Sequence, residues 1–237
     1  MSEEQRLTEH AGWYLESQLD IDRRALRARY RAIRPHLRGP AGLELGPAEG
    51  EMTPMLLDDF AELTIVEGAQ ALLDLIPSNP RLRKVHSVFE DFQPIDRFDT
   101  IVMEHILEHV VDPGELLRRA RTWLTPGGRI IAGVPNALSI HRQAAVKMKL
   151  LAGADQLNER DLSLGHRRVY TLPSLVAEFE RAALATVATG GVMLKPLSYA
   201  QMQEHWTESM IDAFIELGTE FPAIAAEIYA VGEPVTT

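Results

Sequence analysis

The chain of 237 residues contains no cysteine. This absence excludes disulfide bonds, thiolate nucleophiles, cysteine-ligated zinc and iron–sulfur clusters, so any metal would rest on histidine and acidic side chains. The chain also lacks an apolar run of the roughly 20 residues that a membrane-spanning helix requires. Its first ten residues, MSEEQRLTEH, do not show the basic and then apolar profile of a secretory signal peptide. We therefore expect a cytoplasmic protein with no membrane partner.

Positive charge is scarce relative to negative charge. The 24 lysines and arginines stand against 34 aspartates and glutamates, which leaves a formal net charge of −10. Such a surface repels phosphate backbones on average, so we expect no nucleic-acid partner. The 46% of hydrophobic and 24% of charged residues are typical of a globular protein and exclude a disordered chain. We expect a small-molecule partner and either a monomer or a homodimer.

The order of apolar segments predicts a doubly wound α/β fold. From residue 41, short apolar runs typical of buried strands alternate with amphipathic stretches typical of helices: GLELG, LTIVE, KVHSVF, FDTIVM and GRIIAGVP are the predicted strands. Strands separated by helices in this way form a mostly parallel sheet with helices on both faces. Later in the chain we predict a helix over 173–183, a strand over 185–194, a helix over 199–217 and a last strand at AAEIYAVGE.

We expect one domain with four parts: a helical N-terminal cap (1–39), a cofactor-binding half (40–136), a lid insertion (137–170) and a C-terminal part (171–237). The cap has a predicted helix over 11–38 whose many arginines we assign mostly to a solvated face. The lid is long and polar, with helical character around 144–151, as expected of a segment that covers a ligand site. In the C-terminal part, a set of apolar residues at helical spacing predicts a core stripe: Met202, Trp206, Met210, Ala213, Phe214 and Leu217.

The turn after the first predicted strand has the features of a nucleotide site. Gly46 and Gly50 allow the backbone to approach a ligand closely, and a helix follows. Glu67 ends the next strand, 21 residues after Gly46, where an acidic side chain can accept hydrogen bonds from both ribose hydroxyls. A dinucleotide fingerprint would need glycine at Ala48 and a small residue at Glu51. The turn therefore argues against a nicotinamide-dependent oxidoreductase and favours a cationic ligand.

The segment ELGPAEG resembles the first motif of class I S-adenosylmethionine-dependent methyltransferases, with Ala48 in place of the middle glycine. The resemblance continues through FDTIVMEHILEHV, LTPGGRIIAGVPN and GHRRVYT, over about residues 41–184. It implies a seven-stranded sheet of order 3-2-1-4-5-7-6 with an antiparallel seventh strand, and S-adenosylmethionine as cofactor, leaving S-adenosylhomocysteine. It also implies a set of cofactor contacts: Gly46, Ala48 and Gly50 around the methionine portion, Glu67 at the ribose, Asp91 and Phe92 at the adenine, and Glu104 and His105 near the sulfonium, with Glu44 and Gly68 as further cofactor-binding residues.

Histidines after the fourth predicted strand are the candidates for catalysis. We predict that His105 opens a helix, so that His105, Glu108 and His109 share one face, and that His166 approaches from the far side of the lid. Small-RNA 2′-O-methyltransferases resemble this region and hold a metal with such residues, although here His105 replaces a glutamate; some ubiquinone-pathway O-methyltransferases share the run. These four residues are thus possible ligands of a divalent cation. We favour a metal-free site in which His109, then His166 or His105, acts as the base.

The acceptor is expected to contact Asn136, Arg167, Tyr170 and Lys195. Arg167 could bind an anionic acceptor or pair with Glu159 or Asp161 of the lid, and the sequence leaves both open. The leading hypothesis is methylation of a hydroxyl on a small molecule, such as a sugar, hydroxy acid or phenol. The alternatives are methylation of an amine by alignment alone, metal-assisted O-methylation and a non-catalytic cofactor-binding subunit.

Overall fold

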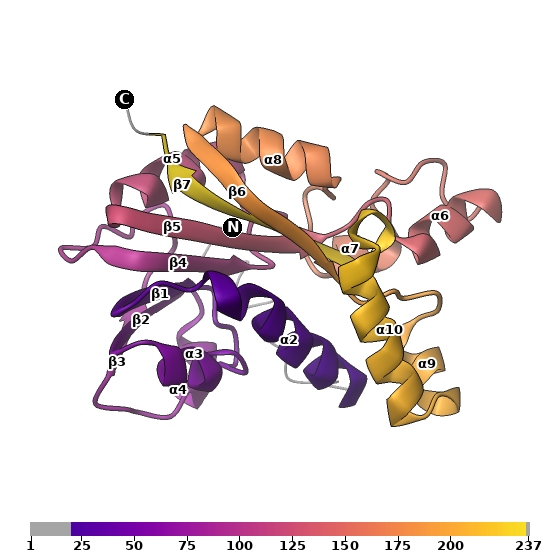
Figure 1. Ribbon diagram of the computed structural model, residues 1–237, viewed down its shortest axis with the longest axis horizontal. Coiled ribbons are helices and arrows are strands. Elements are labelled where there is room, and N and C mark those ends of the chain that lie inside the picture. Colours follow the sequence, from indigo (N-terminus) through magenta and orange to yellow (C-terminus); the bar gives the residue numbers. More distant parts are fainter. Residues whose placement is uncertain (1–19, 236–237) are drawn as a thin grey trace.

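The computed structural model describes residues 20–235, which form one seven-stranded sheet with helices on both faces (Figure 1). The strands are β1 (Ala41–Leu45), β2 (Glu62–Glu67), β3 (Leu82–His86), β4 (Phe98–Glu104), β5 (Leu124–Pro135), β6 (Leu184–Val192) and β7 (Glu227–Pro234). Their order in the sheet is β3-β2-β1-β4-β5-β7-β6. Strands β1 to β5 pair in parallel, whereas β7 runs antiparallel to both β5 and β6. The predicted fold and strand order are confirmed.

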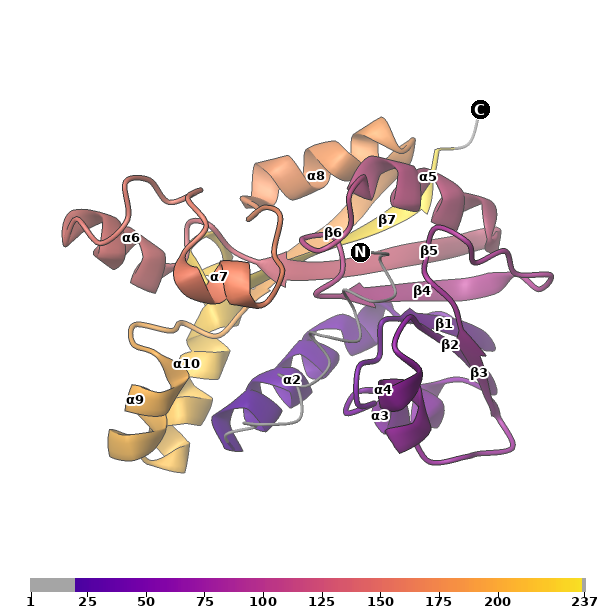
Figure 2. The same cartoon turned by 180° about the vertical axis from the view of Figure 1, so that it is seen from behind.

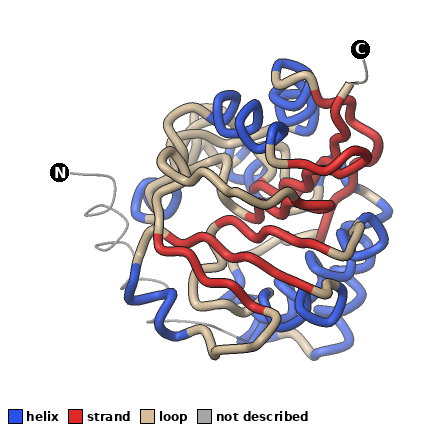
Figure 3. The backbone as a smooth tube through the Cα atoms, turned by 90° about the vertical axis from the view of Figure 1, so that its left-hand side faces the viewer, coloured by secondary structure: helices blue, strands red, loops and turns tan. Residues whose placement is uncertain are grey.

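The strands of the middle of the sheet are apolar on both sides, because both faces are covered. Along β4, Ile101 packs toward the layer of α5 (Pro113–Thr122) and α8 (Leu172–Arg181), while the next residue, Val102, packs toward the opposite layer. That opposite layer contains α3 (Thr53–Asp59), α4 (Gln70–Leu75) and the end of α2 (Asp20–Ile33). Figure 3 shows the helices on either side of the twisted strands. Each fully buried aliphatic side chain contributes about 1.5–3 kcal/mol through burial.

Several helices gather beyond the carboxyl ends of the parallel strands (Figures 1 and 2). They are α6 (Ile140–Lys147), α7 (Glu159–Ser163), α9 (Tyr199–His205) and α10 (Glu208–Glu220). The amino-terminal half of α2 joins α9, α10 and the end of β6 in a small core of its own, in which Ile21, Met193 and Met202 are buried. This arrangement places most of the irregular chain at the sheet edge where doubly wound folds bind ligands.

The predicted helix over 199–217 is wrong, because the structure has two helices there. Ser198 caps α9 and Thr207 caps α10 through side-chain oxygens that accept backbone N–H groups, and Trp206 between the helices is extended. The change of direction shifts the buried face, so Met202 and Ile211 are buried while Met210 and Ala213 are exposed. The predicted core stripe is thus confirmed for Met202 and wrong for Met210 and Ala213.

Two further details of the chain differ from the expectations. The helix expected around 144–151 lies earlier, as α6. The predicted N-terminal helix over 11–38 is present as α2 and a short 3₁₀ turn (Arg34–His36), whereas residues 11–19 lie outside the described part. Among the described helices, none is both long and apolar enough to cross a membrane.

Candidate active site

A cavity of about 420 Å³ opens at the carboxyl ends of β1, β2 and β4. Its size falls within the range of small-molecule sites. The strand ends contribute Gly46, Glu67 and Glu104, and the segment 137–170 contributes Arg160 and His166 from the other side. The cavity is therefore bounded by several of the predicted cofactor residues and by the predicted lid.

The turn after β1 has the backbone conformation that its glycines permit. Gly46 has a φ of 66°, and a Cβ atom there would collide with the side chain of Ile106. Gly50 has a φ of 82°. Ala48 also adopts a positive φ, of 49°, which residues other than glycine rarely do. This explains how alanine replaces the middle glycine of the motif: the turn is kept, with some backbone strain.

Glu67 lies on the cavity wall at the end of β2, where the sequence predicted it. Its carboxylate accepts backbone hydrogen bonds from Ala69, at 2.9 Å, and from Ala48, at 3.3 Å, so it connects two loops of the site. The side chain is only 6% exposed, and this burial raises the pKa of Glu67. A buried carboxylate held by backbone amides is a rigid acceptor for ligand hydroxyls.

Two more carboxylates border the cavity. Burial raises the pKa of Glu44 to about 7, even though Thr53 Oγ1 donates a hydrogen bond of 2.6 Å to its carboxylate. Burial likewise raises the pKa of Glu104 to about 7, against the opposing effect of Arg29. The Glu104 carboxylate lies over Gly133, where any side chain would occupy its space. A cationic ligand in the cavity would favour the ionised form of both glutamates.

His105 does not open a helix, which corrects the prediction. Its φ is 56°, the residues that follow form turns, and the next helix, α5, begins only at Pro113. The ring instead contacts Arg29, with Nη1 2.9 Å from its Nε2, and Glu227, 3.5 Å away, while Nδ1 lies 3.1 Å from Glu108. Burial and Arg29 lower the pKa of His105, but the two carboxylates outweigh them and raise it to about 9.

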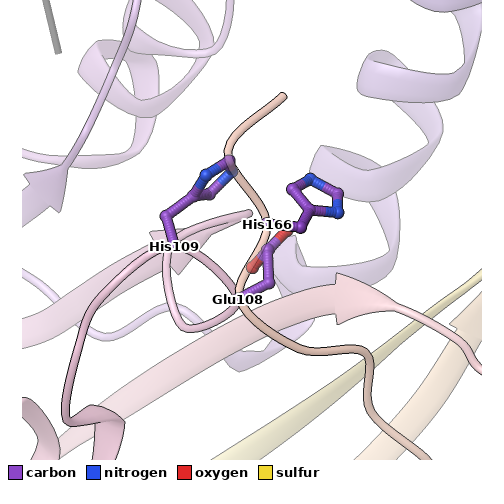
Figure 4. Close-up of side chains that lie close together, drawn as sticks. All are labelled: Glu108, His109 and His166. Carbon is purple, nitrogen blue, oxygen red and sulfur yellow. The ribbon is translucent and has the colours of Figure 1, made fainter. Parts of the chain in front are cut away.

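Glu108, His109 and His166 form a second cluster beside His105 (Figure 4). Their potential ligand atoms all lie within 4.8 Å of one another. The rings of His109 and His166 meet edge to face, with centroids 4.7 Å apart, and both residues line the cavity. Glu108 and His109 come from the turn after β4, and His166 from the loop after α7. The two histidines that we predicted as bases are thus brought together.

The segment 137–170 is held in place by a buried ion pair. Arg142 donates to Asp161 over 2.8 Å, and to the backbone oxygens of Ala154 and Gln156. His166 Nδ1 lies 3.5 Å from the same aspartate. Burial would raise the pKa of Asp161, but His166, Arg142 and a backbone N–H hold it far below its usual value. Asp161 therefore pairs with Arg142, where the sequence left a pairing with Arg167 open.

Several predicted contact residues lie away from the cavity. Asp91 is exposed and Phe92 packs its ring against Trp123, while their neighbours Val88, Phe89 and Glu90 line the cavity in their place. Arg167 and Tyr170 do not line the cavity either. Their side chains donate to the backbone oxygens of His109 and Leu107, at 2.8 Å and 3.3 Å, and so support the turn after β4.

The remaining two predicted acceptor residues line the cavity. Asn136 does so at the end of β5, where its side-chain amide donates to the backbone oxygens of Ala223 and Ala225, at 3.1 Å and 2.9 Å. These bonds give Asn136 a role in holding the chain before β7. Lys195 lines the cavity after β6, with its ammonium over the ring of Tyr199.

Sequence reasoning missed Arg29 and Glu227. Arg29 was assigned to the solvated arginine face of its helix, yet it donates to both carboxylate oxygens of Glu227 at 3.1 Å, inside the cavity. The spacing of Arg29 could have revealed this position. Ile21, Ala25 and Arg29 are spaced four residues apart and therefore share the buried face of α2. No local pattern marks Glu227 at the start of β7.

Comparison with known proteins found a matching family model and several relatives. The family model described as a methyltransferase domain matches residues 16–189. The ubiquinone biosynthesis O-methyltransferase of Aeromonas salmonicida (strain A449) is 30% identical over 108 residues, which cover 45% of this chain and 43% of that protein. The chain thus spans less than half the length of that relative. The enzyme of the same name from Xanthomonas euvesicatoria pv. vesicatoria (strain 85-10) is 26% identical over 189 residues, covering 72% of this chain and 73% of the relative.

Solved structures show the same fold. An S-adenosylmethionine-dependent methyltransferase from Thermotoga maritima, described as a possible histamine N-methyltransferase, superimposes with a TM-score of 0.65. The two chains share 17% sequence identity, and the alignment covers 98% of this chain and 97% of the other. At this identity the likeness concerns the fold alone.

Proposed function

Because the chain belongs to the class I S-adenosylmethionine-dependent methyltransferases, we propose that it methylates a hydroxyl group of a small molecule, with His109 as the general base. The observation that carries the proposal is the pair of His109 and His166 on the wall of the cavity that also contains the turn after β1 and Glu67. The names of the ubiquinone biosynthesis O-methyltransferases, to which the chain is similar, support oxygen as the acceptor atom.

The cofactor would bind along the ends of β1, β2 and β4. Glu67 would accept hydrogen bonds from the ribose hydroxyls, and Gly46, Ala48 and Gly50 would leave space for the methionine portion. Val88 and Phe89 line the cavity after β3 and offer an apolar surface for the adenine, in place of Asp91 and Phe92. The carboxylates of this region suit the positive charge of the sulfonium and the α-amino group.

Methyl transfer is a displacement in which the acceptor oxygen bonds to the methyl carbon while the carbon–sulfur bond breaks. The electron pair of that bond stays on sulfur, which becomes the neutral thioether of S-adenosylhomocysteine. The acceptor hydroxyl must lose its proton, and we assign the proton to the imidazole of His109. His166 packs behind that ring and is itself next to Asp161, so it would hold His109 in place. The rest of the cavity would align the acceptor with the methyl group and exclude water.

A second candidate, metal-assisted O-methylation, is favoured by one specific observation. Glu108 is fully buried, and among the described residues neither of its carboxylate oxygens has a partner in hydrogen-bond geometry, although His105 Nδ1 lies 3.1 Å from one of them. Burial opposes its ionisation, but His105, His109 and His166 lower the pKa of Glu108. An ionised carboxylate beside two imidazoles is a suitable donor set for a divalent cation. Such a cation would lower the pKa of the acceptor hydroxyl.

The experiment that tests the proposed function is transfer of a labelled methyl group. The protein is incubated with methyl-labelled S-adenosylmethionine and fractionated metabolites, and labelled products are identified by mass spectrometry. The proposal predicts products that carry the label on oxygen. Label only on nitrogen would replace it with amine methylation, and no transfer to any fraction would favour a non-catalytic subunit.

A further inference from the structure

Lys195 places an ammonium group on the wall of the cavity. It follows β6 in a turn that leads to α9, and its Nζ lies 4.4 Å from the ring centroid of the buried Tyr199. A cation over an aromatic face at this distance is attracted by the ring. The contact holds the ammonium against the cavity wall but does not neutralise its charge.

The ammonium of Lys195 is not paired with an acidic side chain. Within residues 20–235, Nζ takes part in no ion pair or hydrogen bond, and its contact with Tyr199 is cation–π only. The acidic groups that act on its pKa are Glu227, Asp22 and Asp161, of which Glu227 binds Arg29 and Asp161 binds Arg142. Burial lowers the pKa of Lys195. An enclosed cation without a counter-ion is costly, and a negatively charged ligand would remove that cost.

His141 adds a second unsatisfied polar group to the same wall. It lies in the first turn of the helix α6, it lines the cavity, and its Nδ1 is buried with no hydrogen-bond partner among the described residues. Burial, Lys195 and Arg142 lower the pKa of His141 to about 3, so the ring is neutral at physiological pH. The single N–H of the neutral imidazole is directed to the backbone of Lys195, a hydrogen bond that raises the pKa of His141 against the other effects, so the ring supports the turn that carries the ammonium. Arg160, from α7, lines the cavity on this side as well.

The strand ends contribute the carboxylates Glu44, Glu67 and Glu104, which suit the cationic cofactor. The elements α6, α7 and the turn after β6 contribute His141, Arg160 and Lys195, together with Asp161, which is paired with Arg142. We propose that Lys195, with His141 beside it, binds an anionic group of the methyl acceptor, either a carboxylate or a phosphate. This inference rests on the proposed function, since it assigns the acceptor to this part of the cavity.

Calorimetry on the full chain saturated with S-adenosylhomocysteine tests the proposal. The probes are benzoate, phenyl phosphate and the neutral benzamide. We expect benzoate or phenyl phosphate to bind at least about tenfold more tightly than benzamide, and the stronger of the two identifies the carboxylate or the phosphate. Lys195→Gln should weaken binding of the anion by about 10–100-fold, the loss typical of a hydrogen bond to a charged group. Lys195→Arg should retain most of it.

Lys147→Gln, in the exposed part of α6, is the matched control and should bind the anion like the unchanged protein. Equal anion affinity in Lys195→Gln and Lys147→Gln, or equal affinity for benzamide and both anions, would overturn the assignment. Absence of anion binding while S-adenosylhomocysteine still binds would also overturn it. Failure of S-adenosylhomocysteine itself to bind would instead contradict the proposed function, so the two failures are distinguishable.

Discussion

The imidazole rings of His109 and His166 meet edge to face, with centroids 4.7 Å apart, although 56 residues separate the two in the chain. One ring comes from the turn after β4 and the other from the end of the segment 137–170. Asp161, 3.5 Å from His166, connects this pair to the Arg142 ion pair that holds the same segment. Formation of the His109–His166 pair thus depends on the correct placement of the segment 137–170.

His109→Ala should lower kcat by the 10²- to 10⁴-fold typical of a lost general base, because His109 is the group assigned to remove the proton from the acceptor hydroxyl. Activity of the unchanged protein should survive treatment with a chelator. The measurement is initial rate with an acceptor found by the labelling experiment, and His205→Ala, on an exposed part of α9, is the control.

Loss of activity in chelator, restored by a divalent cation, would support the metal-assisted reaction instead. In that case Glu108→Ala should be about as damaging as His109→Ala, since both would be ligands. Full activity in a His109→Ala, His166→Ala double variant would rule out both mechanisms and leave alignment alone.

Glu44 should make the stability of the protein depend on pH. Its pKa of about 7 in the fold exceeds the usual value of 4.5, so between these values the folded chain retains a proton that the unfolded chain has lost. Stability therefore falls as pH rises from about 4.5 to 7. Glu44→Gln removes this penalty. The free energy of unfolding of the variant minus that of the unchanged protein should therefore increase by about 3 kcal/mol as the pH rises from 5 to 8.

Urea unfolding of both proteins at several pH values measures this difference, and effects of other titrating groups largely cancel. Thr53 can still donate to the amide oxygen of glutamine, so the variant keeps the local hydrogen bond. Parallel curves for the two proteins from pH 5 to pH 8 would show that Glu44 titrates normally in the fold.

Asp161→Ala should destabilise the chain by about 3–5 kcal/mol, because it leaves the buried Arg142 without its carboxylate. We also expect faster proteolysis within 137–170, and loss of the slower cleavage that bound S-adenosylhomocysteine should produce in the unchanged protein. Glu159→Ala, at an exposed position of the same helix, should stay within about 0.5 kcal/mol. Equal stability and equal cleavage in the two variants would contradict the anchoring role of the ion pair.

Features that depend on local sequence could be predicted. Buried strands such as β4 are continuous apolar runs, and the distance from Gly46 to Glu67 is set by one strand–helix–strand unit, so both were recognisable from sequence alone. The error at His105 has a local cause as well. Its positive φ sends the chain into turns, and the apparent helical spacing of His105, Glu108 and His109 is therefore not a helix face.

Features that depend on distant segments could not be predicted. Arg29 and Glu227 lie 198 residues apart, and only the closing of β7 against β5 brings Glu227 to the cavity. Similarly, the position of Phe92 after β3 predicted a contact with the adenine. In the structure the Phe92 ring packs against Trp123, at the end of α5, and belongs to the core. Pairings of this kind follow from packing in three dimensions, and no spacing along the chain encodes them.

Calorimetric titration with S-adenosylmethionine and S-adenosylhomocysteine tests most directly that the cavity holds this cofactor at Glu67. Both compounds should bind with micromolar-order affinity, and NAD should not bind. Glu67→Ala should weaken binding at least about tenfold, since each charge-assisted hydrogen bond to the ribose contributes about 1.5–3 kcal/mol. Glu62→Ala, at the exposed start of the same strand, should leave affinity unchanged. Binding of NAD without a response to S-adenosylmethionine, or equal affinity in the two variants, would contradict the account.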